Sequence, residues 1–236
     1  MVTLGKYISL LIKMVTLYHG SSEIVSCPEY GKGKSYNDYG LGFYCTENIE
    51  LAHEWACTES SGGYVNQYEL DMASLRLLRL DEEPYTILHW LAVLMHNRRI
   101  RISSPVMSRG MEWLEANFMP PVNEADVVIG YRADDSYFSF ARAFVANEIS
   151  LTQLSFAMKL GELGKQTVLK SPTAFRRVRF VSYSSVDRQI YYPRRKRRDE
   201  EARAAYRAEL ERDVSDGLFM LDIIREEIKA DDPRLR

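Results

Sequence analysis

Two short stretches, Tyr18-His19-Gly20-Ser21-Ser22 and Tyr39-Gly40-Leu41-Gly42-Phe43-Tyr44, decide how this sequence is interpreted. In the first, a histidine at the end of a strand expected over 14–20 precedes a glycine. A glycine there lets a flat ligand approach the main chain closely. In the second, a glycine turn leads into a short strand whose aromatic residues can stack on a flat ring. Taken separately, a single histidine is more often a structural residue, and a Gly-x-Gly-aromatic stretch is typical of a turn followed by core residues.

The rest of the chain mixes strands and helices without the regular alternation of a parallel α/β protein. Alternating or continuous apolar runs predict strands, and apolar residues at helical spacing predict helices. Strands are expected over 14–20, 43–46, 64–70, 75–80, 126–130, 166–169 and 176–183, and helices over 49–58, after Pro84, around Trp113 and twice within 134–161. This pattern predicts an α+β fold.

Composition limits the class of protein. The 236 residues carry 31 Lys and Arg against 33 Asp and Glu, for a net charge of −2. This balance argues against a protein that coats nucleic acid, because such proteins bind mainly by neutralising phosphates. Three cysteines are too few for a disulfide scaffold and suit a reducing cytosol, so a cytoplasmic location is expected. The apolar run 7–12 is too short to cross a membrane.

Three segments are expected along the chain. The tetrapeptide Met-Val-Thr-Leu at 1–4 recurs at 14–17, so residues 1–13 are interpreted as a leader and 14–193 as one domain. Residues 194–236 hold twelve basic and twelve acidic residues. Apolar residues near helical spacing make this tail an amphipathic helix, with a bend expected at 215–217. The helix either packs back on the domain or docks a partner, and its basic run 194–198 is either a solvated linker or a phosphate-binding or targeting segment.

In this order, the two stretches resemble the ADP-ribosyltransferase superfamily, in the branch of diphtheria toxin and the poly-ADP-ribose polymerases. That branch has His-Gly-Ser on its first strand and Gly-x-Gly-x-Tyr at its next conserved strand. Asp38 to Thr46, Ala52-x-x-Trp55-Ala56 and the segment 126–135 are similar to a bacterial family of this superfamily, whose genes are often encoded beside small antitoxin-like partners. The resemblance covers about residues 16–183. It implies a split β-sheet core with surrounding helices, here followed by the C-terminal helical tail.

The resemblance implies roles for five residues in binding NAD as a co-substrate. His19 would hydrogen-bond the adenosine ribose, and the main chain of Gly20 would pair with the nicotinamide carboxamide, assisted by Ser21. Tyr44 would stack on the nicotinamide ring. Trp55 falls near the position of another aromatic residue that closes the nicotinamide pocket.

The third catalytic position departs from the pattern of the superfamily. The usual residue there is a glutamate on a late strand that touches the 2′-hydroxyl of the nicotinamide ribose. Gln166 is the candidate here, with Glu162, before the strand, as the alternative. A glutamine can accept the hydrogen bond of the hydroxyl, but it carries no charge and cannot act as a general base. Mono-ADP-ribosylation or slow hydrolysis of NAD is therefore expected rather than chain elongation.

Asp126, Asp134 and Asp135 form an acidic group around a buried strand. They are interpreted as a region that recognises the acceptor or a ribose; the alternative is that Asp134 and Asp135 cap the helix that follows. No metal site is expected, because no His or Cys lies at ligand spacing with them.

The sequence thus leads to three hypotheses of function. The first is a mono-ADP-ribosyltransferase that uses NAD and modifies a macromolecule, as the toxin of a toxin–antitoxin pair with a small antitoxin protein as partner. The second is an inactive module that binds NAD or ADP-ribose, and the third is an NAD glycohydrolase. Direct binding to a long nucleic acid is disfavoured, and no membrane partner is expected.

Overall fold

The computed structural model describes residues 14–133, 135–160, 164–212 and 217–235. The leader expected over 1–13 and the alternative catalytic residue Glu162 lie outside these ranges, as do Asp134 and most of the expected bend at 215–217.

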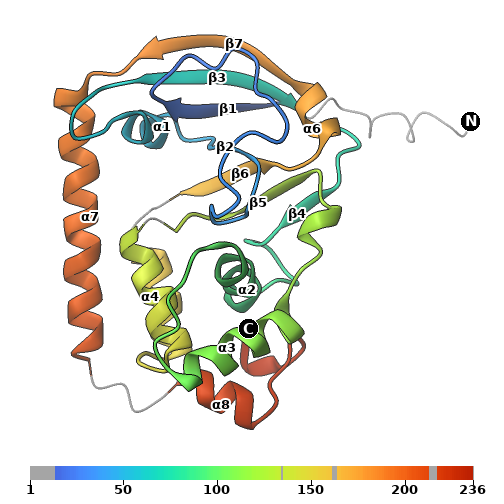
Figure 1. The fold of residues 1–236 in the computed structure, drawn as a ribbon, viewed down its shortest axis with the longest axis vertical. Coiled ribbons are helices and arrows are strands. Elements are labelled where there is room, and N and C mark those ends of the chain that lie inside the picture. Colours follow the sequence, from blue (N-terminus) through green and yellow to red (C-terminus); the bar gives the residue numbers. More distant parts are fainter. Residues whose placement is uncertain (1–13, 134, 161–163, 213–216, 236) are drawn as a thin grey trace, which may run out of the picture.

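The fold is α+β, as the sequence predicts, and contains two open sheets (Figure 1). In the described residues the first sheet has the order β1-β3-β7, from β1 (Met14–Ser21), β3 (Tyr64–Asp71) and β7 (Val178–Ser185), all antiparallel neighbours. The second has the order β2-β6-β5-β4, from β2 (Phe43–Cys45), β6 (Lys165–Leu169), β5 (Val127–Tyr131) and β4 (Leu77–Arg79). Backbone hydrogen bonds between Tyr18 and Thr46 join the two sheets where β1 passes the end of β2.

The second sheet is buried on both faces, and this explains the continuous apolar run in β5. Val127 and Ile129 point into a core shared with the first sheet, to which Leu17 of β1 and Leu70 of β3 contribute. Val128 points the opposite way, into a larger core formed with helices. Successive side chains of a strand alternate between its faces, so a strand covered on both sides needs apolar residues throughout.

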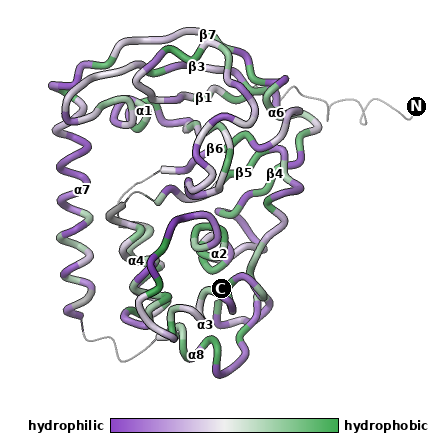
Figure 2. Tube along the Cα trace, in the orientation of Figure 1, coloured by the Kyte–Doolittle hydropathy of each residue, from purple (hydrophilic) through white to green (hydrophobic). Residues whose placement is uncertain are grey.

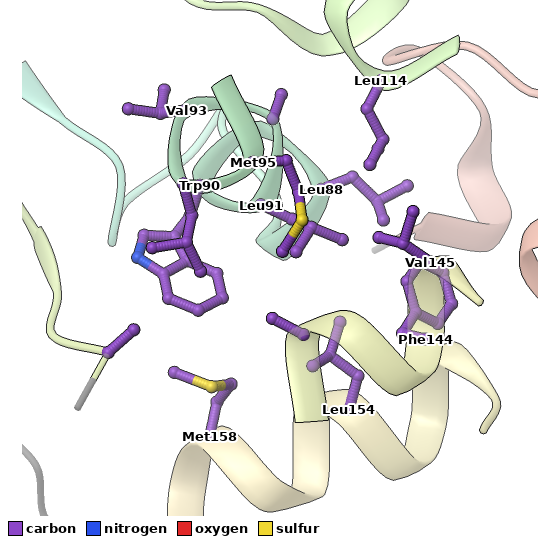
Figure 3. Close-up of a cluster of buried hydrophobic side chains, with 14 of the residues drawn as sticks. Leu88, Trp90, Leu91, Val93, Met95, Leu114, Phe144, Val145, Leu154 and Met158 are labelled. Atoms are coloured by element: carbon purple, nitrogen blue, oxygen red, sulfur yellow. The ribbon is translucent and has the colours of Figure 1, made fainter. Parts of the chain in front are cut away.

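The larger core lies between the second sheet and a group of helices: α2 (Ile87–Asn97), α3 (Pro105–Phe118), α4 (Asp135–Val145) and α5 (Leu151–Leu160). Helix α2 is its centre, and eight consecutive residues, Leu88 to Met95, are buried. Figure 3 shows Trp90, Leu91 and Met95 of this helix facing Phe144, Leu154 and Met158 of α4 and α5. Buried all round, α2 is apolar on every side.

Three shorter helical elements complete this part of the fold. They are α1 (Ile49–Ala56), which lies against β1, the 3₁₀ turn η1 (Val122–Glu124), and α6 (Pro172–Arg177), which precedes β7. In α1 the side chain of Asn48 caps the first turn by accepting hydrogen bonds from two backbone amides. The cap fixes where α1 begins and therefore where Trp55, its penultimate residue, lies.

The C-terminal segment packs back on the body of the molecule. Helix α7 (Arg188–Leu210) is polar along most of its length in Figure 2, yet Ala202 is buried in the larger core and Tyr206 packs edge-on against Phe140, with ring centroids 4.7 Å apart. After it, α8 (Met220–Arg225) and the 3₁₀ turn η2 (Pro233–Leu235) lie near α3. Met220 and Ile223 are buried there. The domain boundary expected at 193/194 falls inside α7.

In the described residues, no helix combines the length and the apolar character needed to cross a membrane.

Candidate functional site

A cavity of about 320 Å³ is lined by residues of β1, β2, β6, the N-terminal part of α7 and the end of α1. The sequence analysis named five of the residues that line it: His19, Gly20, Tyr44, Trp55 and Gln166. Six others complete the wall: Asn37, Asp38, Arg98, Arg132, Ala133 and Arg195. Residues from across the chain therefore meet in one pocket.

His19 is held in one orientation by the main chain of β2. Its Nδ1 lies 2.7 Å from the carbonyl oxygen of Tyr44. A carbonyl only accepts, so Nδ1 carries the proton and donates it, and in the neutral ring Nε2 is an acceptor. Burial lowers the pKa of His19, and the bond to Tyr44 only partly offsets this effect. The imidazole is therefore neutral near pH 7 and presents an acceptor that suits a ligand hydroxyl.

Gly20 turns its peptide groups toward the same edge of β1 as Tyr18. The amide and carbonyl of Tyr18 bond to Thr46, on the side of the strand away from β3. Peptide groups in a strand point to alternate edges, so those of Gly20, two residues later, also point away from β3. Gly20 lines the pocket, and its main chain can there pair with an amide of a ligand.

Tyr44 has its hydroxyl fixed in the protein, so what it offers a ligand is its ring. The hydroxyl donates to the carbonyl of Gly40 at 2.6 Å and accepts from the amide of Tyr39 at 3.0 Å. Burial raises the pKa of Tyr44, which keeps the phenol protonated. These bonds tie the glycine turn to the strand that follows it, and they leave the aromatic face as the part that can stack.

Trp55 carries a cation on its face. The guanidinium carbon of Arg132 lies 4.9 Å from the centre of the Trp55 ring, a cation–π arrangement. Its Nε1 is buried and, among the described residues, has no hydrogen-bond partner. The two side chains form one side of the pocket, and both a flat ring and an anion can be accommodated there.

Gln166 is buried next to an acidic residue that the sequence analysis did not assign to the site. Its Nε2 donates to Oδ2 of Asp38 at 3.2 Å, and its Oε1 is buried with no hydrogen-bond partner in the described part of the chain. The same Oδ2 accepts from the amide of Ala133 at 2.9 Å, and Oδ1 lies 3.4 Å from Nε of Arg98. Burial raises the pKa of Asp38, while Arg98 and the Ala133 amide act in the opposite direction.

Among the described residues that line the pocket, basic side chains outnumber acidic ones. They are three arginines, Arg98, Arg132 and Arg195, and one aspartate, Asp38. Arg195 belongs to the basic run of α7, and its Nη1 donates to the carbonyl of Cys57 at 2.6 Å. The basic run is thus neither a free linker nor a detached appendage, because it brings one arginine to the wall of the cavity. Planar guanidinium groups suit phosphate oxygens.

Other residues named from the sequence lie elsewhere. Ser21 turns to the loop after β1, where its hydroxyl donates to the carbonyl of Glu23. Asp126 precedes β5, at the end of the strand opposite to Arg132 and Ala133, and does not line the cavity. Its carboxylate accepts from the amide of Arg76 at 2.9 Å and from the hydroxyl of Ser171 at 2.5 Å. These contacts hold Asp126 to the residue before β4 and to the start of α6.

Asp135 begins α4, but nothing is described of its side chain, and Asp134 lies outside the described residues. Within the described ranges, no group of three or more His, Cys, Asp or Glu side chains could hold a metal ion.

The sequence offered different amounts of information about the residues that it did not assign. Asp38 stands at the start of the glycine motif, and Arg132 and Ala133 directly follow a strand that ends at the pocket. Arg195 lay in a conspicuous basic run. Arg98 follows α2 with no local pattern to distinguish it, and only the tertiary structure reveals its place.

Comparison of the sequence with known families places this α+β protein in one of them. Residues 15–180 match the family described as "Protein of unknown function (DUF3990)", and the chain belongs to that family. The matched segment includes every residue of the pocket except Arg195. Comparisons with curated proteins and with solved structures gave no match.

Proposed function

We propose that the protein is a mono-ADP-ribosyltransferase that uses NAD as co-substrate. One observation carries the proposal. The resemblance gives roles to six residues, and five of them, His19, Gly20, Tyr44, Trp55 and Gln166, line one cavity although they come from four separate parts of the chain; Ser21 does not line it. The resemblance rested on short motifs, and nothing in their spacing required them to meet.

The geometry of each residue supports its part in the reaction. The main chain of Gly20 and the face of Tyr44 provide a place for a flat carboxamide ring, and Nε2 of His19 accepts from a ribose hydroxyl. Arginines in the wall favour the pyrophosphate. Gln166 Oε1 accepts from a hydroxyl of the second ribose.

The bond between C1′ of that ribose and the nicotinamide nitrogen then breaks, and its electron pair leaves with nicotinamide. An acceptor nucleophile forms the new bond to C1′ and loses its proton. Rigid placement of the two reactants accounts for much of the rate in such a step.

The wider setting belongs to the same proposal. A toxin of a toxin–antitoxin pair, acting in the cytoplasm on a macromolecule and held in check by a small antitoxin protein, agrees with the bacterial family that the sequence resembles. Gln166 in place of a glutamate favours transfer of a single ADP-ribose over chain elongation, because elongation benefits from a general base.

The test is release of nicotinamide from NAD, with and without cell lysate, followed by mass spectrometry of the protein and nucleic-acid fractions for an added ADP-ribose. Tyr44→Ala removes the stacking ring, and Tyr183→Ala on the exposed part of β7 is the matched control. We expect release with the wild type and with the control, and loss of at least about tenfold with Tyr44→Ala. Equal rates of nicotinamide release in all three proteins would refute the proposed enzymatic activity.

Two further outcomes separate the alternatives. Free ADP-ribose without any modified macromolecule indicates a glycohydrolase. Binding of NAD in a calorimeter without turnover indicates a module that binds the dinucleotide only.

A further inference from the structure

The buried contact between Asp38 and Gln166 has no counterpart in the roles implied by the resemblance. Both side chains lie in the wall of the pocket and both are buried, with 6% and 5% of their surfaces exposed. They are 128 residues apart in sequence and are joined by a hydrogen bond of 3.2 Å. An acidic residue at such a depth needs partners, and those of Asp38 within the described ranges include the amide of Ala133, the guanidinium of Arg98 and the amide of Gln166.

The contact with Asp38 fixes which end of the Gln166 amide group faces the carboxyl group. The amide group of a glutamine has a donor end and an acceptor end, and nearly equal shapes allow it to turn over. Oδ2 of Asp38 already accepts from the amide of Ala133 and is therefore an acceptor, so the Nε2 end of Gln166 faces it as a second donor and the Oε1 end faces the other way. Oε1 is the end that is left without a hydrogen-bond partner in the described residues. A buried carbonyl oxygen without a hydrogen-bond donor lowers the stability of the fold, unless a bound ligand supplies the donor.

We infer that Asp38 is a positioning residue, which fixes the amide of Gln166 so that Oε1 is presented as the hydrogen-bond acceptor for a hydroxyl of the bound ligand. This inference rests on the proposed function for the identity of the hydroxyl, that of a ribose of NAD. It also gives a reason for glutamine at this position. A second carboxylate at 166 would lie next to that of Asp38 and repel it, whereas an amide uses Asp38 as its anchor.

The predicted effects differ between two substitutions of Asp38. In Asp38→Asn, the amide oxygen can take the place of Oδ2 and still accept from Ala133 and Gln166, with its NH₂ toward Arg98. In Asp38→Ala no acceptor remains, and Gln166 is free to turn over. Asp38→Asn also removes the ion pair with Arg98 and turns an NH₂ donor toward it. We therefore expect release of nicotinamide to fall in both variants, by about tenfold or more in Asp38→Ala, as for a hydrogen bond to a charged group, and clearly less in Asp38→Asn.

A double-substitution cycle separates positioning from a general effect on the fold. If Asp38 acts through Gln166, Asp38→Ala causes no further loss once Gln166→Ala is present. Equal losses in the two backgrounds, an unchanged rate in Asp38→Ala, or a loss in Asp38→Asn as large as in Asp38→Ala would each overturn the inference.

A spectroscopic measurement tests the contact without NAD and without a variant that must fold. The amide of Ala133 and Nε2 of Gln166 donate to one oxygen, so their protons lie close together. In ¹⁵N-labelled wild-type protein we expect a nuclear Overhauser effect between them. Its absence would overturn the inference whatever the enzyme does. Its presence in a protein that neither binds nor cleaves NAD would instead leave the contact standing and remove the proposed function.

Discussion

A Cβ atom added to Gly20 would lie 2.0 Å from the carbonyl oxygen of Ala52, so β1 and α1 meet backbone to backbone at this point. The added Cβ would also lie 2.8 Å from the backbone nitrogen of Ala56, one helical turn after Ala52. The glycine of the His-Gly-Ser stretch is therefore required by helix packing as well as by the pocket. It determines how closely α1, and Trp55 with it, approaches the edge of β1 that lines the pocket.

The first prediction concerns this contact. Gly20→Ala should destabilise the fold by about 3 kcal/mol, at the upper end for overpacking, because both clashing atoms belong to a backbone that cannot swing aside. Chemical denaturation measures the loss. Gly31→Ala is the matched control, since an added Cβ there meets nothing within 4 Å, although the positive φ of Gly31 adds a smaller cost. Equal losses in the two variants would mean that the approach of α1 does not depend on Gly20.

The second prediction separates the hydroxyl of Tyr44 from its ring. Tyr44→Phe removes the bonds to Gly40 and Tyr39 and should cost about 1–2 kcal/mol of stability, because a buried carbonyl and a buried amide lose their partner. The ring remains, so the affinity for NAD should change by no more than about threefold, far less than in Tyr44→Ala. Thermal unfolding and calorimetry give the two quantities. A loss of affinity in Tyr44→Phe as large as in Tyr44→Ala would show that the hydroxyl, and not the face, binds the ligand.

The third prediction is a pH dependence that arises from His19. Burial lowers its pKa below the usual 6.5, so the unfolded chain binds a proton more readily than the folded one. Stability therefore rises with pH, in a window that extends from the lowered pKa of the folded state up to 6.5. His19→Asn keeps a donor for the carbonyl of Tyr44 but cannot titrate. Urea denaturation at several pH values should give a shallower slope in this variant than in the wild type, and an unchanged slope would contradict a neutral, buried His19.

Local sequence patterns were sufficient for most of the fold. The strand around Val127, the apolar helix α2 and the glycine turn before Tyr44 each follow from residues close in sequence, and the α+β class follows from their order. Two elements were mistaken at their boundaries. Residues 176 and 177 were expected to begin a strand, but they are the last two residues of α6. The start of that helix, with Ser171 as cap and Pro172 as first residue, is a normal helix signal that the strand prediction overlooked. Helix α7 begins at Arg188, and Pro193, a residue that usually ends a helix, lies inside it.

The residues of the pocket also fall into two groups, those that the sequence named and those that only the structure reveals. His19, Gly20 and Tyr44 lie in the two stretches that carry the family resemblance, and the structure brings them together in one pocket. Asp38 and Arg98 could not be assigned from sequence, because their importance depends on contacts across the sheet with Gln166 and with each other. An acid beside a glycine turn and an arginine after a helix are common features. Only burial in a shared cavity distinguishes them from surface residues.

The fourth prediction tests the anionic part of the ligand. Arg195 lines the pocket and is anchored on Cys57, whereas Arg197 of the same helix does not line it. Arg195→Ala should weaken binding of ADP-ribose by about tenfold and leave binding of neutral nicotinamide unchanged, because only the former carries phosphates. Arg197→Ala is the control. Added salt should reduce the difference between the two variants, as screening requires. Equal effects on ADP-ribose and nicotinamide would assign Arg195 a structural role only.

The fifth prediction concerns how α7 is held against α1. Arg198 pairs with Glu54 at 2.6 Å, and their side chains are only 16% and 13% exposed. Burial raises the pKa of Glu54, and Arg198 opposes that rise more than any other neighbour. Removing one partner of a largely buried pair leaves the other without compensation, so Arg198→Ala should cost about 2–3 kcal/mol.

The control for this pair is Arg203 with Asp199, which lie further along α7 at 2.9 Å but are 59% and 38% exposed. An exposed pair at helical spacing contributes about 0.5 kcal/mol or less, so Arg203→Ala should have little effect. Because Arg195 lies one turn before Arg198, loosening this contact should also lower the affinity for ADP-ribose without any change at the pocket wall itself. Denaturation together with calorimetry measures both effects. An Arg198→Ala protein with full stability and full affinity would show that α7 is held in place by its apolar contacts, such as that of Tyr206 with Phe140, and not by this ion pair.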